Sequence, residues 1–76
     1  MKSVEVKFTS INQIVQFVNI VEHYDSDMDL RHGRIVVDAK SLLGVLSLGI
    51  EKRLELQVLD ETCNGLLEKI DFCMVA

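Results

Sequence analysis

The sequence contains no proline and no tryptophan, and it has only four glycines among its 76 residues. Charged residues are spread along the chain without blocks, so no segment has the composition of a disordered tail or a linker. Apolar residues make up 49% of the sequence, enough for one core that buries roughly 60 to 65% of the unfolded surface. We therefore predict a single domain over residues 1–76.

Basic residues are also scarce, because eight Lys and Arg stand against twelve Asp and Glu, giving a formal net charge of -4. This balance disfavours nonspecific binding to nucleic acid phosphates, so we expect protein partners and no nucleic acid. The start of the chain alternates apolar and polar residues after Lys2, unlike the continuous apolar run of a signal peptide or a membrane span. We therefore expect a cytoplasmic protein without membrane insertion.

Cysteine occurs only twice, and both cysteines fall in the last predicted helix, which Asp60 caps and which reaches about Met74. Within one helix, the ten residues between Cys63 and Cys73 correspond to about 15 Å of rise, too far for a disulfide. We interpret both as small apolar core or boundary residues. The two histidines are distant in sequence and no CxxC spacing occurs, so neither a metal site nor a cofactor is expected.

Strands are predicted wherever apolar residues alternate with polar ones or form short β-branched runs. Four segments have this pattern, around residues 4–8, 28–30, 35–37 and 54–58. Gly33 stands between the second and third segments and supplies the positive φ of a tight hairpin. The sequence therefore predicts four strands, with one short hairpin between consecutive strands.

Helices are predicted where apolar residues recur at steps of three and four. The first covers about residues 11–24 and begins after Ser10, which we expect to form a reciprocal capping box with Gln13. The second covers residues 42–48 after Ser41, a favourable N-cap. With the last helix, the order is βαββαβα. We predict a two-layer α+β fold, an open-faced sandwich in which three helices cover one face of a four-stranded, mainly antiparallel sheet.

The most specific motif is the stretch 38–50, DAKSLLGVLSLGI. It closely resembles the second-helix motif of HPr, the histidine-containing phosphocarrier of the bacterial sugar phosphotransferase system. Residues 24–30, YDSDMDL, resemble the family's segment entering the second strand. The resemblance covers roughly residues 14–58, and it implies the HPr-like open-faced sandwich and a role in or near sugar transport.

The chain departs from this family at the start of the first helix. The family carries a phosphoryl-accepting histidine there, whereas this sequence reads TSINQ, with Thr9, Ser10 and Asn12 in the degenerate acceptor region. A neutral hydroxyl without an adjacent base is a poor nucleophile, so we interpret Ser10 as a cap. The resemblance thus implies a divergent member that performs no phosphohistidine relay, and we expect no enzyme activity.

The second helix carries the candidate site. By resemblance, Ser41 occupies the position of the serine that a dedicated kinase phosphorylates in Gram-positive HPr, and Lys40 lies beside it; simple capping by Ser41 is the alternative. The helix is also too apolar for one buried face, so we expect Leu42, Leu43 and Leu46 to point outward as a docking patch. Burial of this patch in a dimer interface or under the shortened chain ends is the other interpretation.

These features favour a regulatory or adaptor relative of HPr whose partners are phosphotransferase-system proteins, HPr kinase or a transcription regulator. One alternative is an active phosphocarrier with a displaced acceptor, although His23 is expected near the end of the first helix and His32 in an exposed turn. Another is an obligate dimer or assembly subunit. A monomer or weak dimer is the expected state.

Overall fold

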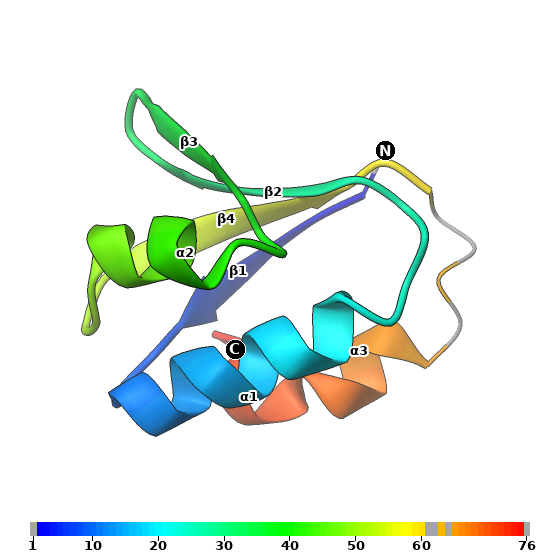
Figure 1. Cartoon of the computed structure of the whole chain (residues 1–76), viewed down its shortest axis with the longest axis horizontal. Helices are drawn as coiled ribbons and strands as arrows, with labels where there is room; N and C mark the ends of the chain where they lie inside the picture. The colour runs from blue at the N-terminus through cyan, green and yellow to red at the C-terminus, as the bar shows by residue number, and fades with distance from the viewer. Residues whose placement is uncertain (1, 61–62, 64, 76) are drawn as a thin grey trace.

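The computed structural model describes residues 2–60, 63 and 65–75. The elements in chain order are β1 (Lys2–Lys7), α1 (Ile11–Val21), β2 (Met28–His32), β3 (Ile35–Asp38), α2 (Leu42–Leu48), β4 (Arg53–Val58) and α3 (Leu66–Lys69), followed by a 3-10 helix (Asp71–Cys73). The predicted order βαββαβα is confirmed. The helices lie on one face of the sheet, with α1 beside α3 (Figure 1).

The four strands form one sheet in the order β1-β4-β2-β3. All three neighbouring pairs are antiparallel. The register aligns one row of apolar residues across the sheet, in which Val4 faces Leu56, Leu56 faces Leu30, and Leu30 faces Val37. Because side chains alternate between the two faces of a strand, this row lies on the helix-covered face. The apolar alternation in the sequence therefore sets the register.

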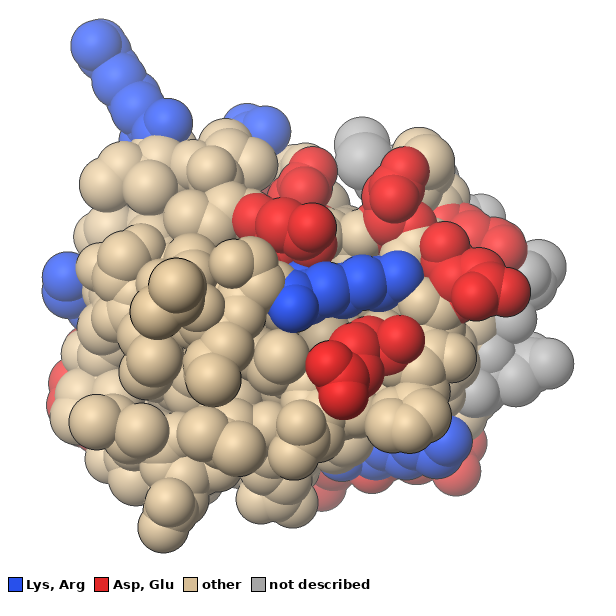
Figure 2. Space-filling model, viewed as in Figure 1, with Lys and Arg blue, Asp and Glu red and all other residues tan. Residues whose placement is uncertain are grey.

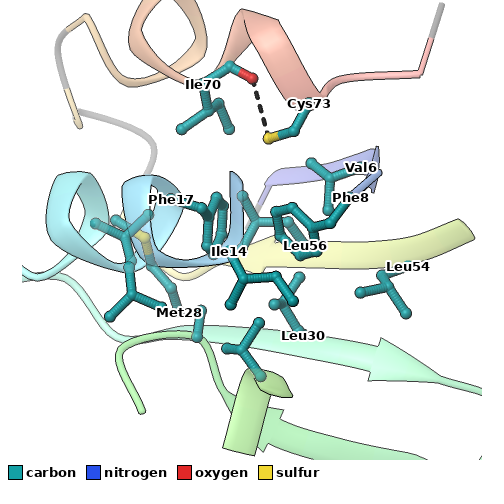
Figure 3. Close-up of a cluster of buried hydrophobic side chains, with 14 of the residues drawn as sticks. Val6, Phe8, Ile14, Phe17, Met28, Leu30, Leu54, Leu56, Ile70 and Cys73 are labelled. Carbon is teal, nitrogen blue, oxygen red and sulfur yellow. Dashed lines mark hydrogen bonds between the residues drawn. The ribbon is translucent and has the colours of Figure 1, made fainter. Parts of the chain in front are cut away.

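The core fills the space between sheet and helices (Figure 3). Phe8 and Phe17 are fully buried and meet edge to face, with their ring centroids 5.1 Å apart. On the opposite face of the sheet, Glu5 and Arg53 are exposed and form an ion pair of 3.7 Å. The arrangement is the predicted open-faced sandwich, with one face packed and the other in solvent.

The third helix is shorter than predicted. It begins at Leu66, with Gly65 in a left-handed conformation (φ 75°) at the N-cap position, so Asp60 is not its cap. Cys63 precedes this helix and Cys73 ends the 3-10 helix, so the prediction of one helix containing both cysteines was wrong. Both thiols are nevertheless free. Positions 61, 62 and 64 lie outside the described residues.

None of the helices in the described part of the chain has both the length and the apolar character needed to span a bilayer. The same residues contain no group of three or more His, Cys, Asp or Glu side chains arranged to hold a metal ion.

Candidate functional site

The loop between β3 and α2 places Ser41 at the start of α2. Its backbone is extended (φ -94°, ψ 109°), and its hydroxyl oxygen accepts a hydrogen bond of 3.1 Å from the amide of Gly44. The Ser41 amide donates to the carbonyl of Asp38 at 3.0 Å, while the Asp38 carboxylate accepts from the Lys40 amide at 2.9 Å. These bonds form a tight turn that fixes where α2 begins, and the predicted N-cap is confirmed.

The Lys40 side chain has a partner in a distant segment of the chain. Its ammonium group donates a hydrogen bond to the backbone carbonyl of Tyr24, in the loop after α1. This contact ties the turn before α2 to the end of α1. A contribution of Lys40 to the charge around Ser41 stays a prediction.

The leucines of α2 divide into exposed and buried sets. Leu43 is 81% exposed and Leu42 is 40% exposed, whereas Val45 and Leu48 are buried in the core. Leu46 departs from the expected outward orientation, because it is partly buried and packs against the core. α2 contacts both α1 and β3, so more than one side of this short helix is covered. The outward apolar set on α2 is therefore Leu42 and Leu43.

The first turns of α1, a helix that contacts α2, also carry exposed apolar side chains. Ile11 is 61% exposed and Val15 is 38% exposed. Figure 2, viewed as Figure 1 is, shows a broad area without charged side chains on the side of the molecule that carries α2 and the first turns of α1. The helical spacing predicted a helix with an apolar face, but it did not show that Ile11 and Val15 would stay in solvent.

The start of α1 is held by a cap, and it carries no imidazole. The Ser10 hydroxyl accepts from the Gln13 amide at 3.2 Å, as predicted. The Gln13 side chain accepts from the amide of Thr9 at 2.9 Å. The predicted capping box has this bond at the amide of Ser10, so the observed donor is one residue earlier in the chain. Ile11 and Asn12 in the first turn are exposed. The side chains at this helix end are thus hydroxyls, amides and an aliphatic group.

Both histidines lie elsewhere. The Nδ1 atom of His23 is 2.6 Å from the carbonyl oxygen of Asn19, so His23 donates a hydrogen bond at the C-terminal end of α1, the end where the sequence predicted it. The 11 residues of α1 rise by about 16 Å, which separates His23 from Ser10. His32 is the exposed last residue of β2, immediately before Gly33 in the hairpin turn.

A comparison with protein-family models identifies the chain. The model for the "PTS HPr component phosphorylation site" matches residues 6–65, most of the sequence. The chain belongs to the HPr family. HPr proteins are phosphocarriers of the phosphotransferase system and not true enzymes, and they interact with other proteins of that system. The resemblance found in the sequence is thereby confirmed at the level of family and fold.

Solved structures agree with this HPr assignment. HPr-C-His from Thermoanaerobacter tengcongensis is similar, with 20% identity and a TM-score of 0.77 over 95% of this chain and 89% of that one. The phosphocarrier protein HPr from Bacillus anthracis str. Ames has 22% identity and a TM-score of 0.72 over 91% and 88%. At these identities the similarity establishes the fold. A comparison with curated protein sequences gives no significant match.

Proposed function

We propose that this HPr family member is a regulatory or adaptor protein that docks partner proteins through α2 and performs no phosphohistidine relay. The supporting observation is the exposed pair Leu42 and Leu43, which directly follows Ser41 on α2. This helix lies on the side of the molecule where Figure 2 shows a broad area without charged side chains. Its proposed location is the cytoplasm. Its proposed partners are phosphotransferase-system proteins, HPr kinase or a transcription regulator.

The energetics of burial support docking at these leucines. Fully burying a leucine side chain contributes about 1.5 to 3 kcal/mol, and Leu43 has most of its surface available. A partner that covers Leu42 and Leu43 therefore gains binding energy from the burial of apolar surface.

We further propose that Ser41 is the site of a regulatory phosphorylation. Its hydroxyl uses only the oxygen as an acceptor toward Gly44, so replacing the hydroxyl proton by a phosphoryl group leaves that hydrogen bond available. The added negative charge lies at the positive end of α2, where it is favourable. Capping alone remains the competing role for Ser41, because serine is favoured at an N-cap without any modification.

Incubation with HPr kinase and ATP, followed by mass spectrometry, tests the switch. We expect one phosphate, located on Ser41, and none in the Ser41→Ala variant. Ser10→Ala is the matched control, because Ser10 caps α1 through an equivalent hydrogen bond of 3.2 Å; this variant should still be phosphorylated. If wild-type Ser41 stays unmodified, the switch is refuted and the docking proposal is unaffected.

Docking is tested separately, by binding of the same kinase to a pair of leucine variants. Leu43→Asp places a charge in the proposed surface and should weaken binding at least about tenfold, which corresponds to about 1.4 kcal/mol. Leu59→Asp is the matched control, because Leu59 is 63% exposed but lies outside α2. Circular dichroism verifies that both variants fold. Equal binding by the two variants would show that α2 is not the docking element.

The absence of relay is tested with enzyme I and phosphoenolpyruvate. The residues at the start of α1 offer no imidazole, and His23 is engaged at the opposite end of that helix. We therefore expect no acid-labile phosphate on the protein. Phosphate on His23 or His32 would contradict the proposal and favour a phosphocarrier with a displaced acceptor.

A further inference from the structure

The two edges of the sheet differ in how they are covered. The outer edge of β1 is partly covered by the C-terminal segment, since Val6 forms a bridge with Met74 and the Val75 amide donates to the Glu5 carbonyl at 3.0 Å. β3 is the strand at the other edge, and no strand within the described residues pairs with its outer side. This edge presents unpaired backbone groups to solvent.

The hydrogen-bond alternation identifies which groups face outward. The Ala39 amide donates to the Met28 carbonyl at 2.9 Å, so this pair is a hydrogen-bonded one. In an antiparallel ladder hydrogen-bonded pairs recur at every second residue, so Leu30 with Val37 is also such a pair. The next hydrogen-bonded pair is His32 with Ile35, so Val36, between Ile35 and Val37, directs its amide and carbonyl away from β2. Val36 is therefore the centre of the open edge.

The side chains along this edge are apolar in the middle and oppositely charged at the two ends. Ile35 is 55% exposed and Val36 is 48% exposed. Arg34 precedes them and Asp38 ends the strand. Among the described residues, no carboxylate lies within ion-pair distance of Arg34. β3 contains no proline or lysine, and its pairing with β2 is continuous without a bulge.

We propose that β3 pairs antiparallel with β3 of a second copy of this chain, about a two-fold axis at Val36. In this register, the outward amide of Val36 in each copy donates to the outward carbonyl of Val36 in the other copy. Arg34 of each copy then faces Asp38 of the other, so a pair of opposite charges lies at each end of the interface. Asp38 faces Asp29 across the hairpin within one copy, and the incoming guanidinium relieves this like-charge contact.

The proposed dimer is weak. A four-residue edge buries little surface, and each copy carries a net charge of -4, which opposes association. Interfaces below the usual size for stable complexes form transient assemblies, so we expect a dissociation constant on the order of 0.1 to 1 mM. Self-association should therefore be visible only in concentrated protein.

Sedimentation equilibrium and a dilution series of amide NMR spectra on the full chain test the dimer. We expect the apparent mass to rise toward two chains with concentration, and the largest shifts to fall on the amides of residues 34–38. A single-chain mass at concentrations of about 2 mM would overturn the proposal. Concentration-dependent shifts centred on another element would do the same.

Variants test the register. Val36→Lys should abolish association, whereas Ile11→Lys, an equal change of charge at an exposed residue of α1, should leave it unchanged. Arg34→Asp alone and Asp38→Lys alone should each weaken it at least about tenfold, because each homodimer then places like charges together twice. An equimolar mixture of the two should associate again, because both end pairs become opposite in charge.

Failure of that mixture to associate, with both variants folded by circular dichroism, would overturn the register. If Asp38→Lys does not fold, because Asp38 also holds the turn before α2, the comparison of Val36→Lys with Ile11→Lys decides alone. Association that survives Val36→Lys would refute pairing through β3.

Discussion

The cap of α2 gives a quantitative test of how this helix is held. Ser41→Ala removes the oxygen that accepts the Gly44 amide at 3.1 Å and leaves that amide without this partner. Losing a serine N-cap typically costs about 1 kcal/mol. For a domain of this size, that loss lowers the melting temperature by about 4 to 8 °C. Because α2 has only seven residues, the change also loosens the surface that carries Leu43.

Ser41→Asp should behave in the opposite way. The carboxylate accepts the same amide, and its negative charge at the start of the helix adds about 0.3 to 1 kcal/mol at low ionic strength. The variant should therefore be at least as stable as the wild type and about 1 to 2 kcal/mol more stable than Ser41→Ala. Added salt screens the charge and should narrow this difference, but it should leave the loss in Ser41→Ala unchanged.

Thermal unfolding followed by circular dichroism, at low and at high salt, measures both effects. Ser10→Ala serves as the reference, because it removes an equivalent cap from α1 and should cost a similar amount. A Ser41→Ala variant that melts with the wild type would refute the assignment of Ser41 as a stabilising cap. Equal melting temperatures for Ser41→Asp and Ser41→Ala would show that charge at this helix end has no effect.

Substitutions of Phe17 and Cys73 probe the core. Phe17→Ala removes a fully buried ring packed against Phe8 and should lower the free energy of unfolding, measured in urea, by about 3 to 5 kcal/mol. Val15→Ala on the same helix is the exposed control and should change this free energy by less than about 1 kcal/mol. Burial raises the pKa of the Cys73 thiol from 9.0 to about 12 in the folded protein. As pH rises from 9 to 12, the thiol therefore ionises in the unfolded chain but not in the folded one, and the free energy of unfolding should fall. Cys73→Ala should remove that slope, measured by urea unfolding at each pH.

The strands could be predicted because their residues alternate between two different environments. Leu54, Leu56 and Val58 are buried, and the intervening residues are charged or amide side chains on the open face. Gly33 has φ 60° in the hairpin, as its position between two apolar runs indicated. These signals are local, so they need no knowledge of the tertiary structure.

The C-terminal region could not be predicted in the same way. Apolar residues at steps of three and four fit one long helix, but they fit equally a four-residue helix followed by a 3-10 turn, because both bury residues at these steps. Leu66, Ile70 and Cys73 are buried in the observed arrangement. Gly65 in a left-handed conformation sets the start of α3, and the sequence indicated only that a glycine there weakens a helix.

The exposure of the leucine side chains on α2 depends on tertiary contacts, which the spacing of apolar residues in the sequence does not reveal. Leu43 and Leu46 are both off the buried stripe of Val45 and Leu48, yet only Leu43 is strongly exposed. The difference arises because α1 and β3 both contact α2 and cover part of its remaining surface. The sequence pattern shows that a helix has more apolar residues than one face can bury. The neighbouring elements determine which of these residues stay in solvent.

Ser10 and Ser41 hold their helices by the same hydrogen bond, so capping alone gives no reason to distinguish them. Their surroundings do differ, because Ser41 is followed directly by the exposed Leu42 and Leu43, whereas Ser10 is followed by Ile11 and the polar Asn12. A phosphoryl group on Ser41 preserves the acceptor for Gly44 and places charge beside an uncharged surface. On the proposed function, phosphorylation therefore changes which partners bind α2 while leaving the melting temperature equal to or above that of the unmodified protein.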